Sequence, residues 1–257
     1  MKKKILEIIK TKNKRPLVCL TAYSKPIAKI LDKYCDIVLV GDSLATAMYG
    51  MKNTHSVTLD TMIQHGISVA SSTSKSLCII DMPANSYKDK KMAIRNAKLI
   101  LKKTKCDAVK IESNGKNYDV ISSIVKSGIP VMGHIGFTPQ HYKKFKAQGL
   151  DQKSRIKLLQ EAKKIEKTGV FSLVLECMSE TLAKEITKLI KIPTIGIGAS
   201  NYCDGQILVT DDMLGLSGFY PKFVKKFVNL NKIIEKGVQK YRTSVLNKKF
   251  PAKKNTF

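Results

Sequence analysis

The sequence predicts an α/β protein built as a closed (β/α)8 TIM barrel. We expect residues 1–257 to form a single domain that begins with a short N-terminal helix. Eight short apolar runs alternate with longer stretches of helical spacing. The runs are rich in Val, Ile and Leu without polar alternation, which is typical of parallel strands covered on both faces. The length of 257 residues also suits one barrel, since such barrels take about 250 residues.

The eight apolar runs give the expected strands in chain order. They cover residues 16–23, 36–42, 77–83, 108–113, 131–136, 171–177, 194–199 and 205–209. Between them, apolar residues recur at about the helical period in 89–104 and 154–169, and Gly169 stands where the second of these helices should stop.

An open, doubly wound sheet is the alternative fold. It is disfavoured because no G-x-G-x-x-G follows the first strand, and "TIGIGAS" has only two glycines and comes near the end. The connection "SNYCD" before the last strand is too short for a helix, so the final turn of the barrel is irregular.

The net charge of +26 raises the question of nucleic-acid binding. Only four of the 46 basic residues are arginine, the side chain that usually contacts phosphate and guanine in bidentate fashion. The lysines are spread over every predicted helix. We therefore interpret the charge as a solvated lysine-rich surface and expect no nucleic-acid partner.

Cysteine usage and hydropathy point to a cytoplasmic protein. The six cysteines lie far apart with no C-x-x-C pair, which disfavours a zinc cage or a disulfide framework and suggests small core residues in a reducing compartment. The longest apolar runs fall short of the ~20 residues that span a bilayer. The basic start of 1–17 is broken by Glu7 and Lys10, and we interpret it as an amphipathic helix rather than a secretory signal.

Polar side chains stand at the carboxyl ends of predicted strands two to six. In "DAVKIES", Lys110 and Glu112 share one face of a strand whose other face carries Val109 and Ile111. Burying either charge alone would be costly, so both need partners. The full set is Asp42, Ser43, Asp81, Lys110, Glu112, His134 and Glu176. In a barrel these ends meet at one rim, which predicts an active site there.

Each of these residues also has an ordinary structural explanation. Asp42 before Ser43 could cap the next helix, Asp81 could form a turn, and His134 could be a satisfied core histidine. Glu176 is harder to explain in this way because it directly follows the apolar "SLVL". The joint occurrence on one rim favours a functional site.

The residue types suggest metal-assisted chemistry. Three carboxylates from separate strands, Asp42, Asp81 and Glu112, are the hard oxygen ligands that Mg²⁺ prefers. A cation would also allow carboxylates to crowd together without protonating. Lys110 and His134 would then face an anionic substrate, which leaves Glu176 as the candidate proton acceptor.

Eight segments together resemble the signature segments of the ketopantoate hydroxymethyltransferase family. In order they are "LTAYS", "VGDSL", "DMPANSY", "VKIES", "VMGHIGFTPQ", "LVLEC", "IPTIGIGAS" and "DGQILV", and the similarity extends from about residue 5 to Phe257. "VGDSL" alone is less specific, because phosphoenolpyruvate mutases and isocitrate lyases are similar there.

The resemblance implies a Mg²⁺-dependent transfer of a one-carbon unit from 5,10-methylenetetrahydrofolate to 2-oxoisovalerate, giving 2-dehydropantoate in the first step toward pantothenate. It implies Mg²⁺ positions at Asp42, Asp81 and Glu112, with Asp42 and Asp81 also binding the substrate. By the same resemblance Ser43, Lys110 and His134 contact the oxo acid, and Glu176 is the general base. It further implies a homo-oligomer, a decamer of two pentameric rings.

The sequence departs from the family at a few positions. Ser24, Ala84-Asn85, Ser200 and Asp211 replace the usual residues, and the segment after "GFTPQ" is shortened to "HYKKFKAQGLD". We expect that segment to form part of a lid over the pocket.

Two other functions stay open from the residues alone. One is a carbon–carbon or carbon–phosphorus lyase on the same Mg²⁺ scaffold, although the K-x-C-G-H motif of those enzymes does not occur in this sequence. The other is a barrel that serves as a scaffold or basic binding protein.

Overall fold

The computed structural model describes residues 3–142, 146–218 and 220–257. By its contacts the chain divides into two compact units, residues 1–209 and residues 210–257. The first contains the complete barrel. That residues 1–257 act as one catalytic domain stays a prediction.

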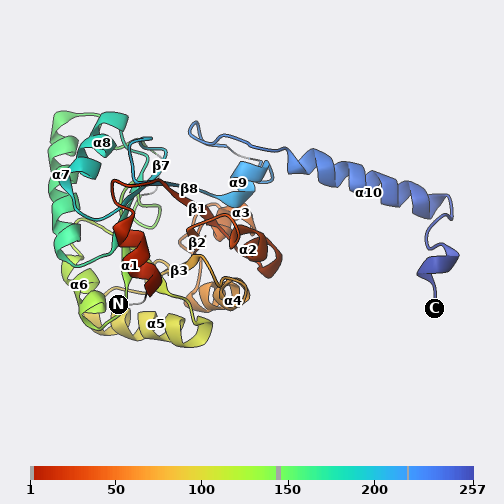
Figure 1. Cartoon of the computed structure of the whole chain (residues 1–257), viewed down its shortest axis with the longest axis horizontal. Helices are drawn as coiled ribbons and strands as arrows, with labels where there is room; N and C mark the ends of the chain where they lie inside the picture. The colour runs from red at the N-terminus through yellow and green to blue at the C-terminus, as the bar shows by residue number, and fades with distance from the viewer. Residues whose placement is uncertain (1–2, 143–145, 219) are drawn as a thin grey trace. The chain divides into compact units, whose positions relative to one another are not determined.

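Eight parallel strands close into a barrel in sequential order, which confirms the predicted fold (Figure 1). The strands are β1 (Leu17–Thr21), β2 (Ile37–Val40), β3 (Leu77–Asp81), β4 (Ala108–Glu112), β5 (Val131–Gly136), β6 (Ser172–Glu176), β7 (Thr194–Ile197) and β8 (Gly205–Leu208). Every predicted strand is present, and most are one to three residues shorter at their ends than the apolar run.

Helices surround this barrel. They are α2 (Lys25–Leu31), α3 (Leu44–Ala47), α4 (Leu59–Ala70), α5 (Lys90–Thr104), α6 (Tyr118–Lys126), α7 (Gln152–Lys167) and α8 (Glu180–Leu189). The longer ones begin at residues that accept a hydrogen bond from the first-turn backbone: Thr58 for α4, Asp89 for α5 and Asp151 for α7. The helices expected over 89–104 and 154–169 are confirmed as α5 and α7, and Gly169 (φ +90°) lies just beyond the end of α7.

Strand alternation separates two apolar cores. Outward residues such as Val109 and Ile111 pack with the surrounding helices. Inward residues such as Ile79, Ala108 and Val174 fill the barrel interior. Because side chains alternate, the strand residues two and four positions beyond these inward ones also point inward.

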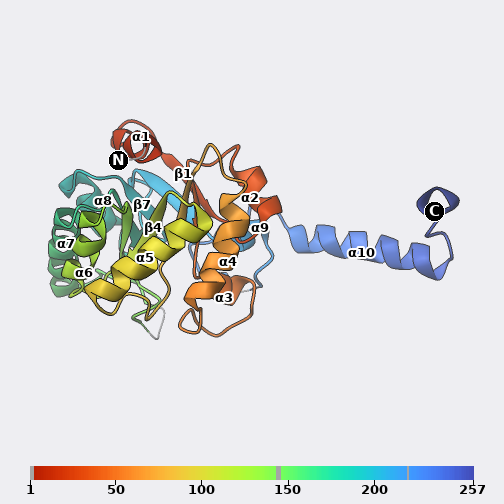
Figure 2. The same ribbon diagram turned by 90° about the horizontal axis from the view of Figure 1, so that it is seen from below.

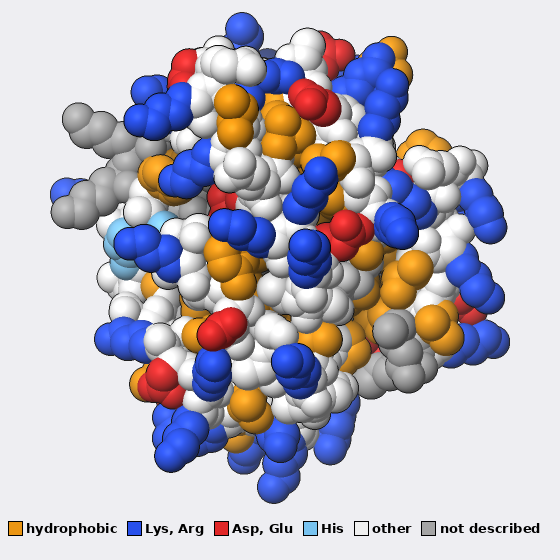
Figure 3. Space-filling view, turned by 90° about the vertical axis from the view of Figure 1, so that its left-hand side faces the viewer, with side chains coloured by type: hydrophobic (Ala, Val, Ile, Leu, Met, Phe, Trp, Pro, Cys, Tyr) orange, Lys and Arg blue, Asp and Glu red, His pale blue; other side chains and the backbone are white. Residues whose placement is uncertain are grey.

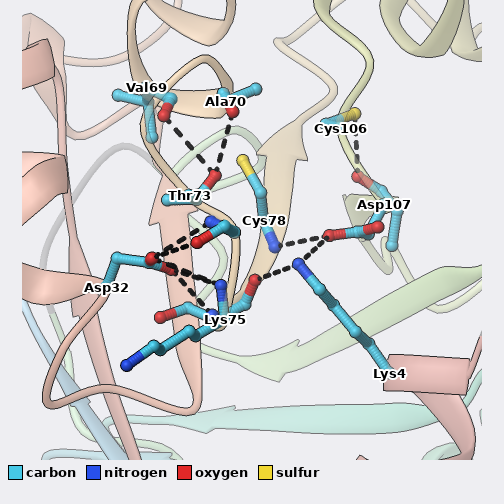
Figure 4. A network of polar contacts seen from close by, with 12 residues as sticks. Lys4, Asp32, Val69, Ala70, Thr73, Lys75, Cys78, Cys106 and Asp107 are labelled. Carbon is cyan, nitrogen blue, oxygen red and sulfur yellow. Dashed lines mark hydrogen bonds and ion pairs between the residues drawn. The ribbon is translucent and has the colours of Figure 1, made fainter.

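Helix α1 (Lys3–Lys10) covers the amino-terminal end of the barrel. Its Ile5 and Ile8 belong to the interior core. Lys4 Nζ donates to the Ser76 carbonyl at 2.8 Å and lies 3.5 Å from Asp107 Oδ2, which ties α1 to the segments entering β3 and β4 (Figure 4). Figure 2 shows α1 and α3 at opposite ends of the barrel, so the carboxyl ends of the strands remain available for a site.

A buried carboxylate organises the turn between α4 and β3. Asp32, at the end of α2, accepts hydrogen bonds from the backbone N–H groups of Ser74, Lys75 and Ser76 at 2.8–3.0 Å and from the Ser74 hydroxyl at 3.0 Å (Figure 4). These donors outweigh burial, the largest single influence, and lower the pKa of Asp32.

The second unit consists of α9 (Thr210–Leu214), α10 (Leu230–Leu246) and a short 3₁₀ helix, Lys253–Asn255. None of the residues of α10 is buried within the chain, although the helix carries an apolar stripe. No helix in the described part of the chain is long and apolar enough to cross a membrane.

The surface is basic without a single concentrated patch on the face seen in Figure 3, where Lys and Arg side chains are interspersed with polar, apolar and a few acidic ones. All six cysteines are buried thiols.

Candidate active site

Strand register brings the predicted polar residues to one end of the barrel. Three neighbouring strand pairs align them across the sheet: Asp81 with Lys110, Glu112 with His134, and Gly136 with Glu176. All of these side chains lie on inward positions at the carboxyl ends of the strands. Lys110, Glu112 and His134 are each at least nine-tenths buried. The structure therefore brings the predicted residues into one buried cluster at that end of the barrel, here termed the pocket.

Asp81 is the anchor of one half of the pocket. Its Oδ1 accepts a hydrogen bond from Lys110 Nζ at 2.7 Å, and its Oδ2 accepts one from the backbone N–H of Asp42 at 3.0 Å. Asp42 does not cap α3, because Ser43 occupies that position without a side-chain capping bond. The side-chain bonds of Asp42 and Asp81 thus join them to Gln140, to Lys110 and to each other, rather than to the start of α3 or to the turn after β3.

Three carboxylates, those of Asp42, Asp81 and Glu112, surround the single positive charge of Lys110. Burial, together with the carboxylates of Asp81 and Glu112, raises the pKa of Asp42 to about 8. Burial is also the largest influence on Lys110 and lowers its pKa, but the surrounding carboxylates outweigh it and the pKa is raised overall. Lys110 is thus a fixed positive charge.

His134 lies between two carboxylates in the other half of the pocket. Its Nδ1 is 3.6 Å from Glu112 Oε1 and its Nε2 is 3.2 Å from Glu176 Oε2. These are ion-pair distances, and neither ring nitrogen has a hydrogen bond of good geometry among the described residues. Although burial and Lys110 lower the pKa of His134, the two carboxylates raise it to about 9. This raised pKa favours the imidazolium form at neutral pH. The lack of a well-formed hydrogen bond to either ring nitrogen also argues against a satisfied core histidine.

Glu176 is the pocket carboxylate that meets solvent. Its side chain is 16% exposed, compared with 1% for Glu112 and 3% for Asp81. The next residue, Cys177, adopts a left-handed φ of +49°, which is uncommon for a residue other than glycine. Its backbone N–H and carbonyl are both hydrogen-bonded, to Ile197 at 2.8 Å and to Gln148 at 2.7 Å. These bonds fix the turn that presents Glu176.

Ser43 lies at the edge of the pocket. Its hydroxyl is 2.8 Å from the hydroxyl of Tyr23, whose carbonyl oxygen is 2.6 Å from His65 Nδ1. A Cβ on Gly41 would come within 2.8 Å of Ser43 Oγ, so the absence of a side chain there lets the strand end approach Ser43 closely.

Two residues of the site were not predicted from the sequence. Gln140 Nε2 donates to Asp42 Oδ2 at 2.8 Å and to the Met82 carbonyl at 3.0 Å, and its backbone N–H donates to Glu112 Oε2 at 3.0 Å. The hydroxyl of Tyr87 donates to Gln140 Oε1. Both side chains are uncharged and lie in loops, so charge at strand ends does not identify them. Their positions shortly after β5 and β3 are the signal that could have done so.

No group of three or more His, Cys, Asp or Glu side chains within the described residues is arranged to hold a metal ion. Asp42, Asp81 and Glu112 share the pocket, but protein donors engage their oxygens. Their predicted role as Mg²⁺ ligands stays a prediction. The lid expected after "GFTPQ" includes residues 143–145, which lie outside the described part of the chain.

The inward ring of carboxylates, a lysine and a histidine at the carboxyl ends of the strands places the protein among the (β/α)8 barrel enzymes. The fold is similar to that of 2,3-dimethylmalate lyase, a phosphoenolpyruvate mutase/isocitrate lyase superfamily member (TM-score 0.63, 13% identity, 100% of this chain and 89% of that chain). It is also similar to phosphonopyruvate hydrolase (TM-score 0.64, 10% identity, 94% and 97% of the two chains). At these identities the likeness shows the fold alone.

Sequence comparison gives the family. The model for ketopantoate hydroxymethyltransferase matches residues 2–253. The 3-methyl-2-oxobutanoate hydroxymethyltransferase of Pelagibacter ubique (strain HTCC1062) is 50% identical over 257 residues, covering 100% of both chains. That of Anaplasma marginale (strain Florida) is 48% identical over 256 residues, covering 98% of this chain and 92% of the relative. The chain belongs to the ketopantoate hydroxymethyltransferase family and is a hydroxymethyltransferase.

Proposed function

We propose that this enzyme transfers a one-carbon unit from 5,10-methylenetetrahydrofolate to 2-oxoisovalerate with the help of Mg²⁺, giving 2-dehydropantoate. The observation that carries the proposal is the pocket itself, in which two buried cations and four carboxylates meet at one end of the barrel. The full-length similarity to 3-methyl-2-oxobutanoate hydroxymethyltransferases supports the oxo acid as the acceptor of the hydroxymethyl group.

The pocket suits a magnesium ion. Its donors are carboxylate oxygens, and burial together with the carboxylates of Asp81 and Glu112 raises the pKa of Asp42, a cost that a bound cation would relieve. Asp42, Asp81 and Glu112 are the residues that would hold the ion. Bound there, Mg²⁺ would polarise the keto oxygen of the oxo acid and acidify its C3–H.

The positive side chains bind and orient the anionic substrate. Lys110, held at 2.7 Å from Asp81, and the imidazolium of His134 provide fixed charges for the carboxylate and keto oxygens of the oxo acid. Ser43, with its hydroxyl beside Tyr23, supplies a further contact at the pocket edge. Because these groups are already fixed by protein contacts, little reorganisation accompanies binding.

Glu176 is the general base that removes the C3 proton. It is the carboxylate with access from solvent, and His134 Nε2 lies 3.2 Å from its Oε2. Removal of the proton leaves an electron pair on C3, which attacks the methylene carbon of the folate in its iminium form. Water then breaks the bond between this carbon and the folate nitrogen: its hydroxyl completes the hydroxymethyl group, its proton goes to the nitrogen, and tetrahydrofolate leaves.

Replacement of the base gives the sharpest test. Glu176→Gln should still bind the oxo acid but lose exchange of its C3 proton by about 10²–10⁴-fold, because the amide cannot accept the proton. Proton NMR in D₂O without folate measures this exchange directly. Glu180→Gln, an exposed carboxylate at the start of α8, is the matched control. Unchanged exchange in Glu176→Gln would eliminate Glu176 as the base.

The complete reaction is tested with 2-oxoisovalerate, methylenetetrahydrofolate and Mg²⁺. We expect turnover that EDTA abolishes and Mg²⁺ restores. Cleavage of a substrate carbon–carbon bond instead of hydroxymethyl transfer would favour the lyase alternative. Binding of DNA, without Mg²⁺-dependent binding of oxo acid, would favour the basic binding protein.

We also propose that the enzyme works in the cytoplasm as a homo-oligomer, a decamer by family resemblance. Its six buried thiols suit a reducing compartment. The fully unburied helix α10 supports contact between copies of the chain.

A further inference from the structure

The two halves of the pocket are joined by one uncharged residue, Gln140. Asp42, Asp81 and Lys110 form one half, and Glu112, His134 and Glu176 form the other. Gln140 contacts both, through its side chain to Asp42 and through its backbone N–H to Glu112. Within the described residues, Gln140 is the hydrogen-bond donor that reaches the Asp42 carboxylate.

The contacts of Gln140 also fix which way its amide points. Both partners of the side-chain nitrogen, Asp42 Oδ2 and the Met82 carbonyl, are acceptors, so the NH₂ group must face them. The amide oxygen then faces Tyr87, whose hydroxyl donates to it. Gln140 is 8% exposed and Tyr87 is 6% exposed, so water competes little for these bonds.

The replacements nearest to glutamine in shape do not satisfy this arrangement. Glutamate would lack the two N–H donors and would place a second carboxylate against that of Asp42. Asparagine is shorter by a methylene and would not span from its backbone to Asp42. Leucine would have a similar volume but leave Asp42 without this donor.

We propose that Gln140 is a positioning residue that ties the segment 137–142 to the ends of β2, β3 and β4. Because of these hydrogen bonds, the orientations of Asp42 and Glu112 depend on where the segment after β5 lies. We call this connection the tie. Tyr87 acts through Gln140 by holding the amide in its required orientation. The inference rests on the proposed function only where it concerns turnover.

The tie itself is tested by hydrogen–deuterium exchange of the peptide covering 137–142. Gln140→Leu should speed its exchange by about 10-fold or more, because the side-chain bonds that resist local opening are lost. Gln148→Leu is the matched control: it is in the same loop, and its side-chain amide donates to the nearby Lys146 carbonyl at 2.9 Å rather than to the strand ends. That control should exchange like the wild type.

The consequence for catalysis is tested by steady-state kinetics. Gln140→Leu should lower kcat by about 100-fold through misplacement of Asp42 and Glu112, with a much smaller change in KM. Gln140→Glu should be at least as impaired, although it is closer in shape to glutamine. If Gln140→Leu does not fold, Tyr87→Phe is tested in its place. We expect it to show faster exchange of the 137–142 peptide than the wild type and a smaller loss of kcat than expected for Gln140→Leu.

Peptide exchange tests the hydrogen-bonded connection, and turnover tests its role in the reaction, so the two can fail separately. Unchanged exchange of 137–142 in Gln140→Leu, or in Tyr87→Phe where that variant carries the test, would overturn the tie. A Gln140→Glu variant with wild-type turnover would overturn the positioning role. Faster exchange in the variants of an enzyme that fails to transfer a hydroxymethyl group would leave the tie intact and reject the proposed function.

Discussion

Lys110 shows how a single residue can serve both the fold and the site. It lies in the middle of the barrel, 6% exposed, and Asp81 is its hydrogen-bonded counterion. Asp42 and Glu112 add further negative charge around it. Three carboxylates compensate the buried charge of the lysine. The lysine in turn reduces the electrostatic repulsion between those carboxylates.

We expect Lys110→Met to destabilise the protein by about 3–5 kcal/mol, because removing one partner of a buried ion pair leaves the other charge uncompensated. Urea unfolding followed by circular dichroism measures the loss. Lys90→Met is the control, since Lys90 pairs with Asp119 on the surface at 3.3 Å and should contribute within about 1 kcal/mol. Equal, small losses in both variants would contradict a buried pair at Lys110.

Asp32 gives a pH-dependent prediction away from the active site. Its pKa is lowered in the folded protein, so its contribution to stability is present above the unfolded value of about 3.9 and is lost as the pH falls through the folded pKa. Asp32→Asn should cost about 1–3 kcal/mol at pH 7, because the amide cannot accept all four hydrogen bonds.

The difference in unfolding free energy between wild type and Asp32→Asn should therefore shrink as the pH is lowered below about 4. Urea unfolding at a series of pH values measures it. Asp119→Asn, on the surface of α6, controls for the loss of a carboxylate. A difference that stays constant down to pH 3 would show that ionisation of Asp32 does not stabilise the turn.

Helix α1 is the element that closes the barrel opposite the active site, and its burial gives a clear stability prediction. Ile5→Ala should lower the unfolding free energy by about 2–5 kcal/mol, because the fully buried side chain packs with the interior core. Leu6→Ala, at the next position and 43% exposed, should cost far less. Similar costs for both, measured by urea unfolding, would show that α1 does not plug the barrel.

At the scale of elements, the sequence predicted most of what positions the site. Continuous apolar runs identified the eight strands, and period-two alternation predicted that Lys110 and Glu112 share the inward face. Gln140 and Tyr87 do not follow from apolar runs or from charges at strand ends, because both are uncharged loop residues. Their hydrogen bonds join Gln140 to Asp42, 98 positions away, and to Tyr87, 53 positions away. Such contacts depend on how loops cross a closed barrel, and no local pattern records that.

At the scale of the whole molecule, the barrel accounts for residues 1–209, and residues 210–257 form a separate compact unit. Its longest helix, α10, places Ile234, Val238, Tyr241 and Val245 at spacings of three and four, and all four are exposed. An amphipathic helix of this length gains most of its stability from packing its apolar face, so this face requires a partner.

We expect the apolar face of α10 to be buried between copies of the chain. Val238→Glu should therefore shift the protein from a large homo-oligomer toward smaller species in size-exclusion chromatography with light scattering, because a charge placed in an apolar interface loses its hydration without gaining a partner. Gln239→Glu is the matched control, because it adds the same charge at the neighbouring position outside the stripe and should leave the assembly unchanged. A wild-type monomer at micromolar concentration, or an assembly that Val238→Glu does not disturb, would show that this face of α10 is not where the copies meet.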